Sequence, residues 1–193
     1  MTKRVCILQG HPHGTGSHFC HALADAYARG AEAVGAEVER LDVARIAPEP
    51  LTSEEEFAIE PEGAMGGARD AIRRTDHLVV VFPLWLGTMP ARLKAFLEQM
   101  ARADFALGES AGGWPEGRLK GRSAHVIVTM GMPALAYRIW FLNSGVAVLK
   151  RLILGMAGMS PVRQTTIGGI DALSDTARRR WLDHIETDGR RLR

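Results

Sequence analysis

The sequence predicts an α/β fold in which helices cover both faces of a five-stranded parallel sheet. Short apolar runs alternate with helical patterns five times along the chain, which is typical of parallel sheets with right-handed crossovers. The run 78–82 is short, rich in valine and followed by Pro83, as expected for a strand buried on both faces. After Pro90, the apolar residues at positions 93, 96, 97 and 100 have the spacing of one helix face.

The other elements follow from the same two kinds of pattern. We expect strands at residues 4–9, 36–43, 78–82, 123–129 and 162–167, with the polar second strand near an edge. We expect helices that begin after Ser17 and after Pro90, a short one at the capping-box pattern 52–55, and others over 68–75, 143–156 and 174–188. Five such strands suit the doubly wound, flavodoxin-like order 2-1-3-4-5, whose switch point lies between strands 1 and 3.

Composition places the chain among ordinary globular proteins. With 193 residues, 46% hydrophobic and 24% charged, it fits a single domain over residues 1–193 and excludes a disordered or fibrous chain. A net charge of +2 gives no electrostatic reason to expect nucleic acid binding. Cys6 and Cys20 form no disulfide framework, and no apolar signal region precedes the first strand. The stretch 139–159 is interrupted by polar residues and does not predict a membrane span, so we expect a cytoplasmic protein.

Three loops are expected at the same end of neighbouring strands, where open parallel sheets bind ligands. Residues 11–17 contain Gly14, Gly16, Thr15 and Ser17 and open a helix, whose free N–H groups favour an anion. Residues 83–89 offer Trp85 and backbone amides, and residues 130–133 offer a glycine that lets a ligand approach the backbone. Together these loops could hold a planar heterocycle with its phosphate on the first loop, and N–H groups aimed at the ring would stabilise a reduced flavin. The alternative is that Trp85 belongs to the core and the glycines only form turns.

Four histidines near the first loop raise the question of a metal. His11, His13, His18 and His21 lie on a turn and a helix start, where we expect them to splay outward, and zinc sites usually add cysteine or carboxylate ligands. We therefore expect no metal, with His11 as a phosphate-side donor and His13 and His21 at the surface. Four aromatic residues could be core or could close a pocket from a partner subunit: Phe105, Trp114, Trp140 and Phe141.

Several of these motifs resemble the flavodoxin-fold NAD(P)H:quinone oxidoreductases, the DT-diaphorase-like family. The resemblance runs from Val5 to about Gly169, and its most specific part is the block Phe-Pro-Leu-Trp at 82–85 followed by Pro-Ala-Arg-Leu-Lys at 90–94. His11-Pro12 with Ser17, and Leu-Lys-Gly-Arg at 119–122 with Thr-Met-Gly at 129–131, match as well. The family binds FAD or FMN, dimerises, and passes a hydride from NAD(P)H through the flavin to a quinone or similar acceptor.

The resemblance also implies roles for individual residues. The flavin phosphate and ribityl chain would lie near His11, Ser17, His18 and Phe19, beside Thr15 of the same loop. The isoalloxazine would be lined by Pro83, Leu84, Trp85 and Leu86, and its pyrimidine edge held by Thr129, Met130, Gly131 and Met132. Tyr137 stands where relatives have a tyrosine that assists hydride transfer, but no histidine follows it here, and Met-Gly-Met-Pro replaces the usual Thr-Gly-Gly loop.

The sequence is compatible with two classes of function. The first is a flavin-dependent two-electron reductase that works as a homodimer, with a quinone, azo compound or nitroaromatic as acceptor. The second is a non-catalytic flavoprotein, either an electron carrier or a regulatory subunit docked on a membrane transporter. Carriers tend to be strongly acidic, which a net charge of +2 does not match. The sequence leaves FMN against FAD and NADH against NADPH undecided.

Overall fold

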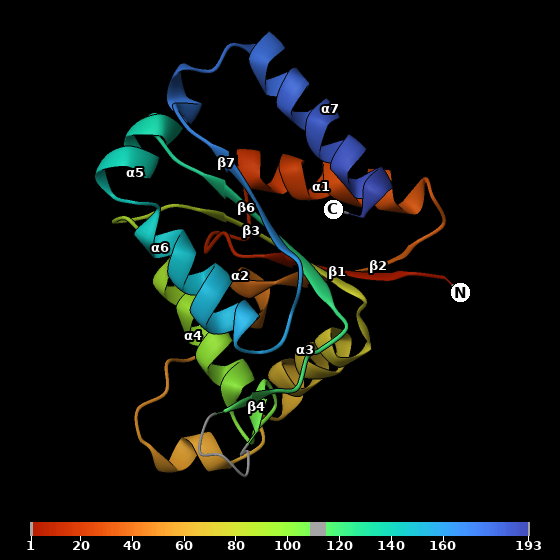
Figure 1. Ribbon diagram of the computed structural model, residues 1–193, viewed down its shortest axis with the longest axis vertical. Helices are drawn as coiled ribbons and strands as arrows, with labels where there is room; N and C mark the ends of the chain where they lie inside the picture. The colour runs from red at the N-terminus through yellow and green to blue at the C-terminus, as the bar shows by residue number, and fades with distance from the viewer. Residues whose placement is uncertain (1, 109–114, 193) are drawn as a thin grey trace.

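The structure is a computed structural model that describes residues 2–108 and 115–192. It contains one five-stranded parallel sheet, β2-β1-β3-β6-β7, which confirms the predicted order 2-1-3-4-5 (Figure 1). Its strands are β1 (Arg4–Gln9), β2 (Glu37–Asp42), β3 (His77–Pro83), β6 (Ser123–Thr129) and β7 (Val162–Ile167). The polar β2 lies at an edge, as its sequence indicates. No helix in the described part of the chain combines the length and apolarity needed to cross a bilayer.

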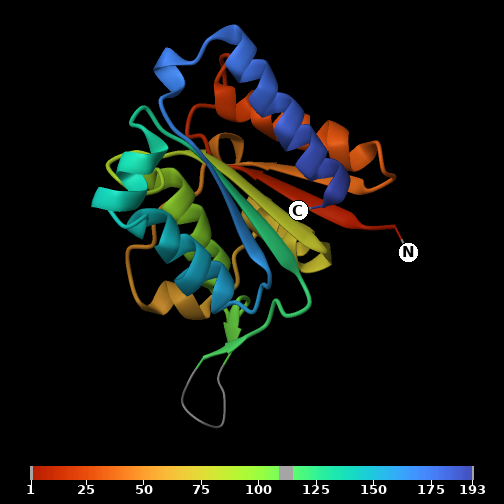
Figure 2. The same cartoon turned by 45° about the horizontal axis from the view of Figure 1, so that its top comes forward.

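Helices cover both faces of the sheet, so the central strands are buried on both sides (Figure 2). On one face lie α1 (Phe19–Glu32) and α7 (Asp175–Arg191), packed on a core that includes Ile7, Val79 and Ile127. The other face is covered by α3 (Gly63–Arg74), α4 (Ala91–Ala101) and the π-helix η2 (Val148–Gly155). Shorter pieces complete the fold: α2 (Val43–Ile46), η1 (Glu55–Ala58), β4 (Leu107–Gly108), β5 (Glu116–Gly117), α5 (Ala134–Trp140), α6 (Ser144–Ala147) and η3 (Ile170–Ala172).

The helices differ from expectation more than the strands do. The segment α5 was not predicted, and the expected helix 143–156 consists of α6 and η2. The third helix begins at Gly63 rather than 68, although three glycines in its first turns disfavour it locally. The short helix near 52–55 is the 3₁₀ turn η1, steadied by a hydrogen bond from the Thr52 hydroxyl to Glu56. Residues 103–120 carry the β4–β5 hairpin, and Trp114 falls outside the described residues.

A row of hydrogen-bonded polar side chains crosses the α1 side of the core at the amino end of the sheet. The Tyr27 hydroxyl and the Nε2 atom of His77 are 2.9 Å apart, and the Nδ1 atom of His77 is 2.7 Å from the Ser123 hydroxyl. Burial, with smaller contributions from His125 and Arg163, lowers the pKa of His77 from 6.5 to about 4. The fold therefore holds this imidazole neutral.

Acidification is expected to destabilise the protein through His77. Because its folded-state pKa is below the unfolded value, the unfolded chain binds the extra proton, and stability falls as pH decreases from 6.5 to about 4. The loss attributable to this group approaches about 3 kcal/mol at the lower limit. Urea unfolding at a series of pH values measures it. His77→Gln should flatten this part of the profile, and an unchanged profile in that variant would assign the acid sensitivity to other groups.

Candidate active site

Three loops meet at the carboxyl edge of the sheet, as the sequence predicts. They follow β1, β3 and β6, which are neighbours in the sheet. Backbone hydrogen bonds connect them: the Gly10 amide donates to the Val81 carbonyl at 2.7 Å, and the Leu84 amide donates to the Thr129 carbonyl at 2.7 Å. A Cβ atom on Gly10 would lie 2.7 Å from a methyl carbon of Leu93, so this glycine allows the close approach of the first loop to α4. The three loops thus form one continuous surface at the carboxyl edge of the sheet.

The first loop presents the N-terminus of α1 without a carboxylate. His18 is the N-cap residue and makes no capping hydrogen bond through its side chain, and the first turn of α1 contains no acid. The preceding residues Thr15 and Ser17 are exposed, and Gly16 adopts the left-handed φ of 95° that favours glycine. The first N–H groups of a helix have no intrahelical acceptor and form the positive end of its dipole. This end of α1 therefore favours a bound anion.

The four histidines come together beside this helix end, which corrects the expectation that they splay outward. The rings of His11 and His18 stack with centroids 3.9 Å apart, and the Nδ1 atom of His13 lies 2.9 Å from the Nε2 atom of His18. The Thr15 hydroxyl is 3.1 Å from the other nitrogen of the His13 ring. His21 reaches the carbonyl of Gly16 at 3.2 Å, so all four histidines brace the loop. The described residues contain no group of three or more His, Cys, Asp or Glu side chains arranged to hold a metal ion.

His11 is the buried member of this cluster. Burial first, and then the neighbouring His18, lower its pKa to about 4. The Nδ1 atom of His11 lies 3.1 Å from the amide nitrogen and 3.2 Å from the carbonyl oxygen of His13, so the loop backbone holds this atom in either neutral tautomer. A neutral His11 can donate one hydrogen bond to a ligand without adding charge.

The second loop forms a tight turn that presents Trp85. The amides and carbonyls of Trp85 and Thr88 exchange hydrogen bonds of 2.9 and 3.0 Å. Leu86 and Gly87 between them have φ of 47° and 82°, the left-handed conformation of such turns. Trp85 is half exposed, so the alternative that it belongs to the core is wrong. Pro90 is the N-cap residue of α4, one position before the first helical residue at which such a proline was expected.

Tyr137 supports this turn from behind. Its side chain is 1% exposed, and its hydroxyl donates to the Gly87 carbonyl at 2.9 Å. Gly145 of α6 packs against the same peptide, because a Cβ atom there would lie 2.0 Å from the Gly87 oxygen. The structure thus places Tyr137 beneath the second loop, where it holds the turn in position.

Of the four third-loop residues predicted to hold the pyrimidine edge of a flavin, only two are exposed. Thr129 and Met130 are buried, and the Thr129 hydroxyl lies 3.2 Å from the Cys20 sulfur rather than at the surface. The carbonyls of Met130 and Met132 already accept hydrogen bonds from Ile170 and Gly169. Gly131 and Met132 are exposed, so these two residues are the ones that a ligand can reach.

The segment behind the third loop is pinned to the edge strand β7. Asn143 and Gln164 exchange two side-chain amide hydrogen bonds of 2.9 and 3.0 Å. Leu142 and Asn143 both have positive φ, of 50° and 56°, and the paired amides hold this unfavourable turn between α5 and α6. Trp140 and Phe141 just before it are exposed, whereas Phe105 is buried in the core.

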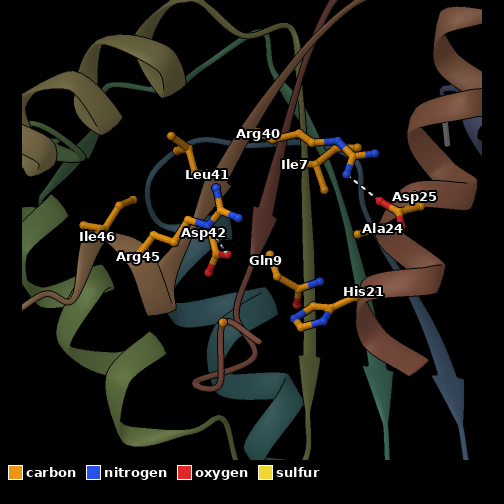
Figure 3. A pocket seen from close by; sticks show the side chains of 11 residues that line it. Ile7, Gln9, His21, Ala24, Asp25, Arg40, Leu41, Asp42, Arg45 and Ile46 are labelled. Carbon is orange, nitrogen blue, oxygen red and sulfur yellow. Dashed lines mark hydrogen bonds and ion pairs between the residues drawn. The ribbon is translucent and has the colours of Figure 1, made fainter. Parts of the chain in front are cut away.

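Two cavities flank the first loop, and sequence reasoning did not find most of their lining. One of about 560 Å³ lies between His13, Trp85, Arg92 and the segment 47–50. The other, of about 470 Å³, extends from Gly14 and His21 to the end of β2, where Arg40 forms an ion pair with Asp25 (Figure 3). Arg40 and the segment 47–50 belong to an edge strand and a proline-rich connection, which carry no motif that marks them as part of a site.

A doubly wound sheet with three ligand-accessible loops at its switch point defines a flavodoxin-like α/β protein. The sequence profile of the flavodoxin-like fold family matches residues 3–187, and the chain belongs to this family. Among solved structures, Smu.1420 from Streptococcus mutans is 28% identical with a TM-score of 0.83, covering 97% of this chain and 99% of its own. The NAD(P)H:quinone oxidoreductase from Methanothermobacter marburgensis is 22% identical with a TM-score of 0.83, covering all of both chains, and shows the shared fold.

Curated relatives match from 47% to 92% of the chain. The FMN-dependent NADH:quinone oxidoreductase of Thiobacillus denitrificans is 29% identical over 114 residues, which are 59% of this chain and 53% of that protein. The chain thus spans about half the length of this relative in the match. An uncharacterized NAD(P)H oxidoreductase of Haemophilus influenzae is 25% identical over 183 residues, 92% of this chain and 89% of that protein.

Proposed function

We propose that the protein is an FMN-dependent oxidoreductase that passes a hydride from NAD(P)H to a quinone or a similar aromatic acceptor. The observation that carries the proposal is the meeting of an uncapped α1 N-terminus with the exposed Trp85 turn and the exposed Gly131 at one edge of the sheet. A phosphate and a planar ring need these two kinds of surface side by side. Relatives named as FMN-dependent NADH:quinone oxidoreductases support both the reaction and FMN over FAD.

Three groups of residues at this edge of the sheet would hold three parts of FMN. The phosphate and ribityl chain would be held at the α1 N-terminus by the backbone and side chains of His11, Thr15, Ser17, His18 and Phe19. The ring would lie on the second loop, formed by Pro83, Leu84, Trp85 and Leu86. Its pyrimidine edge would meet the third loop, where Gly131 and Met132 reach the ligand while Thr129 and Met130 support them from the interior. FMN, when bound, supplies the ring that accepts and passes on the hydride.

The protein contributes orientation and a fixed polar surface. Hydrogen bonds to Thr88, Thr129 and Gly87 fix the second loop before a ligand binds. The amides of Leu84, Trp85 and Thr88 are used in these contacts, so the amides left for the ring would be those of Leu86 and Gly87 and, in the third loop, those of Gly131 and Met132. Trp85 excludes water from one side of the ring. With one exposed surface for two substrates, we expect ping-pong kinetics, in which nicotinamide leaves before the acceptor binds.

We further propose that the chain acts as a single flavin-binding domain and as a homodimer. An apolar cavity of about 310 Å³ between α4 and η2 supports the dimer, with Leu97 and Leu152 on its two walls. Lys94 and Glu98 also line it as an ion pair, so a second copy would meet a surface of balanced charge. A cytoplasmic location is proposed because Cys6 and Cys20 are both free, buried thiols.

An absorption spectrum of the purified protein tests the central proposal. The protein is reconstituted with FMN or FAD, and NADH or NADPH is added without oxygen. We expect FMN to bind, its spectrum to bleach within seconds, and a soluble quinone to restore it. Failure to bind either flavin, or a bound flavin that neither nucleotide bleaches, would contradict the proposed reaction.

Tyr137→Phe distinguishes two roles for this residue. The catalytic role that the family resemblance implies predicts a rate loss of about 100-fold or more and an altered pH profile, as for general acids. The hydrogen bond to Gly87 instead supports a positioning role. We therefore expect kcat/KM to fall by less than about 10-fold with an unchanged pH profile, and stability to fall by about 1 kcal/mol. Steady-state kinetics across pH and thermal unfolding measure these effects, and a large loss with a shifted profile would restore the catalytic role.

A further inference from the structure

The short helix η3, which follows β7, is attached to the third loop by backbone hydrogen bonds. The Gly169 amide donates to the Met132 carbonyl at 3.0 Å. The Ile170 amide donates to the Met130 carbonyl at 3.2 Å. Because Gly131 lies between these two carbonyls, η3 stands beside the part of the loop that a ligand can reach.

The acidic residue of η3 lies directly against this loop. A Cβ atom on Gly131 would lie 3.0 Å from the Oδ2 atom of Asp171, so the carboxylate occupies the space beside the Cα atom of Gly131. Asp171 is exposed, and in the part of the chain that the structure describes it takes part in no ion pair and no side-chain hydrogen bond. The carboxylate is therefore an acceptor that is available to a ligand.

Arg178 of α7 holds η3 in this position. Its Nη2 atom donates to the Ile170 carbonyl at 2.6 Å, and its Nε atom donates to the Leu173 carbonyl at 3.3 Å. These two carbonyls lie on either side of Asp171, so the guanidinium fixes the backbone that carries the carboxylate. The same guanidinium lies over the Phe19 ring, 5.2 Å from its centroid, and so connects η3 to the start of α1. The position of Asp171 is thus set before a ligand binds.

We propose that the Asp171 carboxylate accepts a hydrogen bond from the N3–H group of the FMN ring and that its charge lowers the reduction potential of the flavin. The inference rests on the proposed function, in which the pyrimidine edge of the ring meets the third loop. That edge presents one N–H group between two carbonyl oxygens, so it needs an acceptor flanked by donors.

The third loop offers this combination. The amides of Gly131 and Met132 make no backbone hydrogen bond among the described residues and can donate to the ring oxygens. The carbonyls of Met130 and Met132 already accept hydrogen bonds from η3, so they do not supply the acceptor. The Asp171 carboxylate, beside Gly131, supplies it.

The charge of Asp171 has a further effect on the flavin. A fixed negative charge beside the ring opposes the negative charge that the ring gains on reduction, because like charges disfavour each other. Solvent screens the exposed carboxylate, so we expect an effect of about tenfold on the equilibrium between the oxidised and reduced flavin. The lower potential makes the reduced flavin a stronger donor toward its acceptor.

FMN and 3-methyl-FMN, in which a methyl group replaces the N3 hydrogen, test the hydrogen bond by fluorescence titration. The unmodified protein should bind 3-methyl-FMN about 10-fold more weakly than FMN. Asp171→Ala should bind FMN about 10-fold more weakly than the unmodified protein does, and should bind both flavins equally. Asp175→Ala is the matched control, because Asp175 is also exposed and lies four residues further on. It should keep both the affinity and the preference for FMN.

Asp171→Asn separates the charge from the hydrogen bond, since the amide oxygen of asparagine still accepts. This variant should bind FMN within about 3-fold of the unmodified protein. Its midpoint potential, measured by anaerobic titration against a redox dye, should be higher by about 30 mV, which is a tenfold change for a two-electron couple. Asp175→Asn should leave the potential unchanged.

Three results would overturn the role of Asp171. They are no preference for FMN over 3-methyl-FMN in the unmodified protein, an equal preference in Asp171→Ala, and an unchanged or lower potential in Asp171→Asn. If the unmodified protein still binds FMN and is bleached by NADH or NADPH, only this role fails and the proposed function stands. If the unmodified protein binds no flavin, both proposals fail.

Discussion

Replacing Ser17 by glutamate is expected to weaken FMN binding by about 100-fold while leaving the fold intact. Ser17 is exposed immediately before the N-cap residue of α1, where no side chain makes a capping hydrogen bond and the first turn contains no acid. A carboxylate there would be stabilised by the same N–H groups that are proposed to hold the flavin phosphate, and would repel it. For the helix alone the change is favourable, by about 0.5 kcal/mol. Lost binding together with maintained or increased stability is the expected signature.

Fluorescence titration with FMN and with riboflavin measures this effect. Ser17→Gln is the matched control, since it adds similar volume without charge. Riboflavin has no phosphate, so its binding should be about equal in the two variants and the unmodified protein. If the glutamate and glutamine variants bind FMN equally well, the phosphate does not lie at the N-terminus of α1, and the first loop has another role.

Gly30→Val is expected to destabilise the fold by about 3 kcal/mol or more. A Cβ atom on Gly30 would lie 2.0 Å from the Glu186 carbonyl oxygen, and one on Gly189 would lie 2.3 Å from the Tyr27 carbonyl oxygen. The backbones of α1 and α7 therefore touch at this crossing, and any side chain must push the helices apart. Urea unfolding gives the free energy of unfolding directly.

Gly67→Ala provides the contrasting result. Gly67 lies inside α3, and a Cβ atom there would meet no atom within 4 Å among the described residues. Alanine is the better helix former, so this variant should be more stable by about 0.5 to 1 kcal/mol. Equal effects of the two substitutions would show that the α1–α7 crossing tolerates separation, contrary to the geometry.

The strands could be predicted from the sequence because each is an apolar run with turn residues at both ends. The first, fourth and fifth expected strands coincide with β1, β6 and β7. The segment α5 was missed because its exposed face is as apolar as its buried one, so no amphipathic pattern marks it. The helix η2 was expected as an ordinary helix, since a π-helical hydrogen-bond pattern has no clear sequence signal over eight residues.

The location of the candidate site was predictable, but its fine structure was not. Strand order brings the three loops together, and that order follows from the alternation of strands and helices. The histidine cluster depends on how His13 folds back onto His18 within the first loop, which spacing alone does not determine. The contact between Tyr137 and Gly87 joins residues 50 positions apart through a single hydrogen bond, and no local pattern indicates it.

The amide pair of Asn143 and Gln164 makes the α5–α6 turn sensitive to chemical ageing. Each side chain donates to and accepts from the other, so the pair requires an amide at both positions. Deamidation of Asn143 would replace its donor by a carboxylate oxygen, which would face the carbonyl oxygen of Gln164. It would also place the first negative charge in the stretch between Glu116 and Asp171. Stored samples that accumulate a more acidic form would thus lose the support of a turn whose backbone conformation is unfavourable by itself.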